Sequence, residues 1–494
     1  MSHPAIQRVP FLLLKDECNR EAYVPKVVSI GPYHHGKPEL RLVESFKPTA
    51  LNLFVSGGRE EISFYHEKIF EVIGEVRKCY DEESTKAYTD HDLADMMLLD
   101  ACLILNHITI QVGIHEVDPL VPLNRERIFD FILLENQHLG RLIRTFLVRD
   151  LLLLENQIPF RIVKLLIQLR YENNEGEHLL NRYGGWWAVV AADEECFGGG
   201  RRGGWYMNLA IFGNYRQKRG GASTLMGKEE GPLHLLDALR CFVISDCIEP
   251  VKTRGVVTGP STNLEPGTDP APSQTSCTST VLSSMHKIRA YMRLTVKEAN
   301  EVDYIEKYFH SFRSVTDLKA KGIHFRPSPT ESLMDVKFTS NFLYAQLQLP
   351  FWCVSIYSKV FFLNIIVFEF SPNNVSCGEV TAYVHFMKSL IERPEDVKEL
   401  REKRILINML GSDEEVLNVY KDIDTYGGFN QRIFHDVKEK IQSHYNSKRK
   451  TWIAELIHTY FRSPWTVLTF LAAFTLLCLS SLQTYFTVYP KSDK

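Results

Sequence analysis

The chain has 494 residues, of which 45% are hydrophobic and 24% are charged. This length suffices for two or three domains with a large core, so a small disulfide scaffold, a disordered chain and a fibrous protein are excluded. The 57 basic residues nearly balance the 60 acidic ones and leave a formal charge of −3. No overall field attracts nucleic acid, and any partner must be recognised locally. The ten cysteines form no CxxC pair, which favours a reducing compartment over a disulfide framework.

The first part of the chain, residues 1–183, is predicted to be helical after an extended start. Long helices are disfavoured before Arg41 by Pro10, Pro25, Pro32 and Pro38. Apolar residues at helical spacing predict one helix over 60–80, and the nearly continuous apolar segment 92–108 predicts a buried helix. Further helices are expected over 127–169, where Pro159 should end or kink one of them.

The middle of the chain differs in composition. Residues 184–231 contain twelve of the 28 glycines and three of the six tryptophans, which predicts a flexible insertion or a gene-model artefact such as a translated intron. A short helix is expected within 232–253. The Pro/Ser/Thr-rich run 254–285 is interpreted as a linker.

Residues 286–460 are predicted to form short strands followed by helices. The segment 335–356 alternates between apolar and polar residues over part of its length, which indicates two strands. The apolar run 360–370 is compatible with either a strand or a buried helix. Helices are expected over 380–392 and 393–404, and Ser412 with Glu415 matches a capping box. The predicted fold is therefore mainly α with a small β-sheet, an α+β body followed by one C-terminal transmembrane helix over 464–489.

That terminal segment carries no charge from Trp465 to Tyr489, the expected ends of the span. As a helix it would be roughly 38 Å long, against about 30 Å of hydrocarbon in a bilayer. A buried core helix is the alternative, but core helices seldom lack charge over such a length. Aromatic residues at both ends fit the two membrane interfaces.

The orientation of the body follows from the flanking charge. Lys448, Arg449, Lys450 and Arg462 precede the span, which favours a tail-anchored protein with its body in the cytosol, on the plasma membrane or an endomembrane. The tripeptide that begins at Asn374 is a glycosylation acceptor, usable only if the body is lumenal or extracellular.

Candidate residues for chemistry are few, because GxxxxGK[ST], HExxH and GxSxG motifs are missing from the sequence. His34 and His35 could ligate a metal, but no third ligand follows at a suitable spacing, and a structural turn is favoured. Asp100 lies alone in an apolar run, where a general acid with a raised pKa is possible and a hydrogen-bonded structural role is favoured.

A second polar group consists of Glu155, Asn156 and Gln157. These side chains either satisfy backbone groups near Pro159, which is favoured, or form part of a binding surface. The Gly-rich stretch also contains two basic residues close to an aromatic one, namely Arg201, Arg202 and Trp205. A single patch of this kind does not predict nucleic-acid binding. We predict no catalytic, cofactor or metal site and do not expect an enzyme.

Several segments together resemble one known family. They are IGPYHHG at 30–36, RDLLLLENQIPF at 149–160, HLLDALR at 234–240, GSDEEV at 411–416 and the apolar terminus from 460 to 489. In this combination and order, the chain is similar to the plant family that carries domain of unknown function 247. The resemblance implies a membrane protein with a large helical body and one C-terminal span, without an established activity. It also implies a link to growth, stress responses or, in grasses, self-incompatibility loci.

These observations lead to the hypothesis of a membrane-anchored interaction protein that recognises an unidentified protein partner. Family resemblance extends this hypothesis to a role in self-incompatibility or signalling. The alternative is a hydrolase-like enzyme that uses Asp100 or Glu155 with His34 or His35. That alternative requires these side chains to converge within hydrogen-bond reach. The sequence leaves the oligomeric state open.

Overall fold

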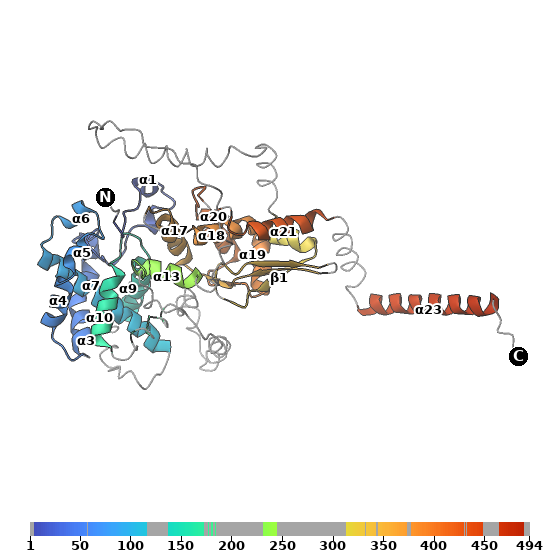
Figure 1. The fold of residues 1–494 in the computed structure, drawn as a ribbon, viewed down its shortest axis with the longest axis horizontal. Helices are drawn as coiled ribbons and strands as arrows, with labels where there is room; N and C mark the ends of the chain where they lie inside the picture. Colours follow the sequence, from blue (N-terminus) through green and yellow to red (C-terminus); the bar gives the residue numbers. More distant parts are fainter. Residues whose placement is uncertain are drawn as a thin grey trace, which may run out of the picture. The chain divides into compact units, whose positions relative to one another are not determined.

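The computed structural model describes residues 4–115 without 57, 137–171, 176, 179–180, 183, 231–244, 313–372 without 331, 342 and 343, 377–447 without 429 and 431, and 464–488. The predicted insertion up to residue 230, the linker 254–285, the glycosylation tripeptide at 374 and the patch at 201–205 lie outside these residues. The element order confirms an α+β protein with mostly helical structure (Figure 1).

Only short elements precede Arg41, as the prolines predict. The helical elements up to residue 244 are α1 (Phe11–Leu14), η1 (Arg20–Ala22), η2 (Pro38–Leu40), α2 (Arg41–Glu44), α3 (Lys47–Ser56), α4 (Ile62–Phe70), α5 (Ile73–Arg77), α6 (Glu82–Thr85), α7 (Asp90–His115), α9 (Gln137–Asp150), α10 (Phe160–Arg170) and α13 (Leu235–Ile244).

Helix α7 is the buried helix that the apolar segment predicts. Its residues Met97, Ala101 and Ile108 are wholly inaccessible to solvent. Helices α3, α4, α5 and α10 all pack against α7, and Figure 1 shows them gathered around it. Because apolar residues nearly encircle this helix, it can be covered from several sides at once. The core of this region is therefore built around α7.

Two helix predictions in this region are wrong in detail. The expected helix over 60–80 is divided into α4 and α5, because Val72 leaves helical geometry (φ −109°, ψ 3°). The break lets Ile69, Ile73 and Val76 all become buried, although they lie on two helices. Pro159 does not end a helix: α9 ends at Asp150, and Pro159 directly precedes α10, a position that proline tolerates.

The part of the chain from residue 314 to 446 contains the sheets. Its elements are α16 (Val315–Ala320), β1 (Ile323–Pro327), β2 (Lys337–Ser340), β3 (Ala345–Leu349), β4 (Trp352–Val354), α17 (Ser358–Glu369), α18 (Glu379–Leu390), α19 (Pro394–Glu402), β5 (Leu406–Asn408), α20 (Asp413–Asp422) and α21 (His435–Asn446).

The larger sheet has the strand order β1-β3-β2. Strand β1 runs parallel to β3 with Ile323 opposite Ala345, and β2 runs antiparallel to β3 with Phe338 opposite Leu347. A second sheet joins β4 and β5 in parallel. The segment 335–356 holds three strands rather than the predicted two, and β1 and β5 were not predicted. Both of them pair in parallel with strands of that segment, a pairing that no local pattern indicates.

The helices of this part follow the sequence closely. The ambiguous run 360–370 is a buried helix, α17, and helices α18 and α19 confirm the two that were expected. The capping box is half formed. The Ser412 hydroxyl accepts the Glu415 backbone N–H, but the Glu415 carboxylate accepts from the N–H of Gly411, one residue before the cap.

The last element is α23 (Pro464–Val488), which begins and ends within one residue of the predicted span. Its proline occupies the first helical position, where the missing N–H is not needed. The stretch Leu468–Tyr485 is long and apolar enough to cross a membrane, and none of it is buried in the protein. The structure therefore has one candidate membrane-spanning helix in the part of the chain that it describes.

Candidate functional site

The loop at residues 30–36, the IGPYHHG loop, is hydrogen-bonded to helix α7. Gly31 has a left-handed backbone (φ 73°), and its N–H donates to Oδ2 of Asp100 at 2.7 Å. A Cβ atom at this position would lie 2.6 Å from the carbonyl oxygen of Gln157. Both the backbone angle and the close approach require glycine here. A larger residue at position 31 would therefore force the loop away from Gln157.

Asp100 itself pairs with a lysine from α3. The Lys47 Nζ lies 2.6 Å from Oδ1 of Asp100 and 2.6 Å from Oε1 of Glu44, and it donates to the Ser29 carbonyl oxygen at 2.7 Å. The side chains of Lys47 and Asp100 are only 2% and 1% exposed. A buried charge of this kind is stable only when paired, so the geometry fits the structural interpretation of Asp100.

The pKa values of this pair are shifted by competing causes. Burial raises the pKa of the Asp100 carboxyl, although the Lys47 charge opposes the shift. Burial also disfavours the Lys47 ammonium, but the charges of Asp100 and Glu44 together outweigh it and raise the pKa of Lys47. We take the pair as ionised, because the lysine lies between two carboxylates and donates to a carbonyl oxygen.

A second buried carboxylate, Asp150 at the end of α9, fixes the chain just before the IGPYHHG loop. Its Oδ2 accepts the backbone N–H groups of Lys26, Val27 and Val28 at 2.8, 2.8 and 3.2 Å. Arg149 lies 2.7 Å from the other oxygen. Three donors on one carboxylate oxygen replace the strand or helix partners that this extended segment lacks.

Asn156 and Gln157 complete the attachment. Asn156 accepts from the Ile30 N–H at 2.7 Å and donates to the carbonyl oxygens of Val28 and Asp150. Gln157 donates to two carbonyl oxygens of its own turn, at 2.8 and 2.9 Å, and accepts from the Leu236 N–H at 3.1 Å. Both side chains thus satisfy backbone groups, which is the favoured of the two predicted roles.

Glu155 and His34 are the two candidate residues that the fold brings together. Nε2 of His34 lies 3.1 Å from Oε2 of Glu155, and the two side chains are 7% and 9% exposed. The other Glu155 oxygen accepts the Val9 N–H at 2.7 Å, and Nδ1 of His34 lies 2.8 Å from Nζ of Lys37. The two side chains converge as the enzyme hypothesis requires, but Nε2 of His34 makes no hydrogen bond in the described structure. Because its Nδ1 faces the Lys37 ammonium, neither ring nitrogen is arranged as in a general-base dyad.

His35 does not join that pair. Its Nδ1 lies 4.0 Å from Oε2 of Glu44, and its ring meets Tyr88 edge to face. Within the described ranges, no group of three or more histidine, cysteine, aspartate or glutamate side chains could hold a metal ion.

Among the residues of this network, Lys47, Asp150 and Asn364 were not singled out in the sequence. Asn364 on α17 accepts the Leu154 N–H at 2.9 Å and donates to the carbonyl oxygens of Ala22 and Val360 at 2.8 Å each. It thereby joins three segments that are far apart in the chain. The sequence does carry a signal for Asn364, because it is a single amide inside the apolar run 360–370. A buried polar group needs hydrogen-bond partners, so an amide in this position indicates a structural contact.

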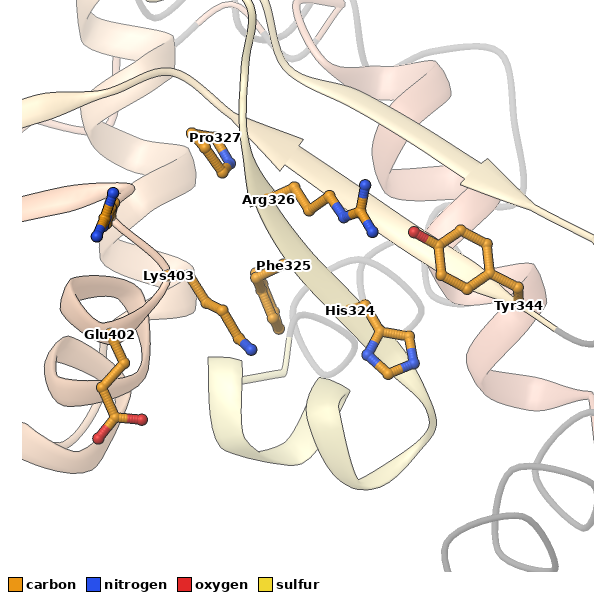
Figure 2. Close-up of a pocket in the computed structure, with 8 residues that line it drawn as sticks. His324, Phe325, Arg326, Pro327, Tyr344, Glu402 and Lys403 are labelled. Atoms are coloured by element: carbon orange, nitrogen blue, oxygen red, sulfur yellow. The ribbon is translucent and has the colours of Figure 1, made fainter. Parts of the chain in front are cut away.

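A separate feature lies at the sheet edge. Residues of β1, of the approach to β3 and of the end of α19 line a surface hollow of about 510 Å³ (Figure 2). Its side chains are mostly basic or aromatic, and none of them was singled out in the sequence.

Together, the described elements define an α+β protein with a mostly helical body, and among them α23 is the one candidate membrane-spanning helix. The chain belongs to the DUF247 family, described as plant protein of unknown function, whose sequence profile matches residues 6–479. This confirms the resemblance found in the sequence.

Two curated relatives come from Arabidopsis thaliana. The chain is 28% identical over 480 residues to UPF0481 protein At3g47200, covering 94% of this chain and 82% of that protein. It is 30% identical over 181 residues to Putative UPF0481 protein At3g02645, covering 36% of this chain and 33% of that protein. No solved structure matches the chain.

Proposed function

We propose that this protein is anchored in a membrane by α23 and that its folded body recognises another protein. The observation that carries the proposal is the terminal helix: its apolar stretch Leu468–Tyr485 is unburied. In water such a surface is strongly unfavourable, whereas in hydrocarbon it is stabilised. Confinement to one membrane raises the effective concentration of any partner on the same surface, which gives a single span a function.

The proposed orientation places the body in the cytosol. Basic residues precede the helix from Lys448 to Arg462, and only two lysines follow it. The protein is then tail-anchored, in the plasma membrane or an endomembrane.

The internal contacts of the polar motifs support recognition rather than catalysis. Asp100, Asn156 and Gln157 use their polar atoms on the protein's own backbone and on Lys47. Such a network fixes the shape of the body, and a fixed shape favours specific binding because little entropy is lost on association. A role in signalling or in self-incompatibility extends this proposal by family resemblance alone.

The test begins with the anchor. Deleting residues 464–494 should move the protein from the membrane to the soluble fraction of plant cells, with the body still folded by circular dichroism. Replacing the same residues by an unrelated tail anchor should restore the membrane location. A deletion variant that stays on membranes would contradict the anchor proposal.

Recognition is tested by proximity labelling in the same cells. The set of labelled proteins should survive exchange of α23 for the unrelated anchor, and it should be lost when a fluorescent protein is placed on α23 in place of the body. If both chimaeras label the same proteins, the body contributes no recognition.

The second candidate function is a hydrolase-like enzyme, favoured by the 3.1 Å approach of His34 to Glu155. It predicts that the full chain hydrolyses small activated esters and that His34→Gln removes this activity while the melting temperature hardly changes. A purely structural pair predicts the reverse, with no hydrolysis in the wild type and a lowered melting temperature in the variant.

A further inference from the structure

The hollow beside β1 is formed by segments that are distant in the sequence. Figure 2 shows that its side chains come from the strand, from the residue before β3, and from the end of α19 and the turn after it. Those that matter here are His324, Arg326, Tyr344, Glu402, Lys403 and Arg404. Its volume of about 510 Å³ falls within the range of small-molecule sites, roughly 300–1,000 Å³.

The charges in the hollow do not balance. Arg326, Lys403 and Arg404 make no ion pair with any described residue, and Glu402 is the one carboxylate in the lining. The three cations therefore leave an excess of two positive charges. Neighbouring cations do have partners: Lys319 pairs with Glu399, and Arg401 pairs with Asp413. Ion pairing around the hollow thus leaves the cations in its lining available.

The backbone contributes to this concentration of charge. Arg404 adopts the left-handed conformation (φ 57°), which is uncommon for a residue with a side chain. The chain turns sharply there between α19 and β5, and Lys403 and Arg404 both line the hollow. Residues held in such conformations occur often at binding sites, where the surrounding structure maintains the strain.

Aromatic rings form one wall. The rings of His324 and Tyr344 stack with centroids 5.5 Å apart and an interplanar angle of 18°. Burial lowers the pKa of His324, and the positive charges of Lys403, Arg326 and Lys319 lower it further.

We propose that the hollow binds the phosphate group of a small phosphorylated molecule. A phosphate monoester carries about 1.5 to 2 negative charges near neutral pH, which matches the excess of two positive charges. Its oxygens accept bidentate hydrogen bonds from guanidinium groups, and two of the three cations are arginines. The aromatic wall offers a flat surface for the remainder of the ligand. The proposal is independent of protein recognition by the body.

The test uses the full chain in a neutral detergent with inorganic phosphate and pyrophosphate as probes. Isothermal titration calorimetry at about 0.15 M salt, where long-range attraction is largely screened, should show saturable binding of one probe per chain. The double variant Arg326→Gln/Lys403→Gln should weaken binding of the probe at least about tenfold, because it removes two of the three cations in the lining. A tenfold change corresponds to about 1.4 kcal/mol of binding free energy. The matched control Arg41→Gln removes an exposed cation that does not line the hollow, and it should change binding less than about twofold.

The outcomes are distinct. The proposal is overturned if neither probe saturates, or if the double variant binds as well as the wild type while circular dichroism shows both to be folded. The source of the phosphate is distinguished in nanodiscs. If it belongs to a lipid headgroup, adding phosphatidic acid to phosphatidylcholine discs should lower the apparent affinity for pyrophosphate in the wild type and not in the double variant. If the ligand is soluble, the affinity should be the same in both discs.

Discussion

Two regions of this molecule concentrate polar side chains, and they differ in how those side chains are partnered. Beneath the IGPYHHG loop, Lys47 and Asp100 are almost inaccessible to solvent and paired with each other. In the hollow beside β1, Arg326 and Lys403 are exposed and make no ion pair among the described residues. Buried groups must be satisfied internally, whereas exposed cations remain available to a ligand. The IGPYHHG motif, by which the family is readily recognised, therefore serves to hold the fold together. The proposed binding site lies instead in a part of the sequence where no motif was evident.

The largest expected effect comes from breaking the buried pair. Lys47→Met should reduce the free energy of unfolding by about 3–5 kcal/mol, because it leaves the Asp100 charge buried without its partner. Urea unfolding of the full chain in neutral detergent, followed by circular dichroism, measures the change. Lys68→Met is the control, since Lys68 forms only an exposed pair with Glu71 and its loss should cost far less stability. Equal losses in both variants would show that the buried Lys47–Asp100 pair supports the fold no more than an exposed ion pair does.

The next effect separates two glycines of the same loop. Gly31→Ala and Gly36→Ala both place a side chain at a positive φ, of 73° and 80°, which costs about 1–2 kcal/mol. At Gly31 the new Cβ would also lie 2.6 Å from the Gln157 carbonyl oxygen, whereas nothing lies within 4 Å at Gly36. Gly31→Ala should therefore lower the urea midpoint more than Gly36→Ala. The reverse order would show that the loop does not approach Gln157 this closely.

A smaller effect concerns pH. Burial lowers the pKa of His234 to about 4, so the folded protein binds fewer protons than the unfolded chain between pH 6.5 and about 4. The stabilisation is complete above pH 6.5 and is lost as the pH falls through this window, by at most about 1.4 kcal/mol per unit for this histidine. His234→Asn keeps an acceptor for the Asp237 N–H and should flatten the pH dependence of the urea midpoint. An unchanged slope would assign the effect to other groups, such as His107 and His385, whose pKa values burial also lowers.

The smallest effect is expected in the hollow. Arg326→Gln/Lys403→Gln should change the free energy of unfolding by less than about 0.5 kcal/mol without ligand, because both side chains are exposed and no ion pair is removed in the described structure. The same urea series provides the measurement. A loss of several kcal/mol would mean that these cations support the fold, and the contrast between the two regions would no longer hold.

Features that depend on local composition could be predicted without a structure. The burial of α7 followed from its apolar circumference, the limits of α23 followed from an uncharged stretch, and α19 followed from a proline and acids in its first turn. Each of these properties is set by neighbours within a few turns of the chain. The family was also recognisable at this level, because its motifs are short and contiguous.

Contacts between residues that are distant in the sequence could not be predicted from local patterns. Lys47 pairs with Asp100 across two helices, and Asn364 accepts from Leu154, 210 residues away in the sequence. The run 360–370 became a helix because α13, α18 and α20 surround it, and β1 joined β3 through a parallel register that no local pattern encodes. The hollow combines β1 with the turn after α19 in the same way. The local spacing of apolar residues indicates whether a segment is a helix or a strand and whether it is buried. The elements against which that segment packs depend on the complete chain.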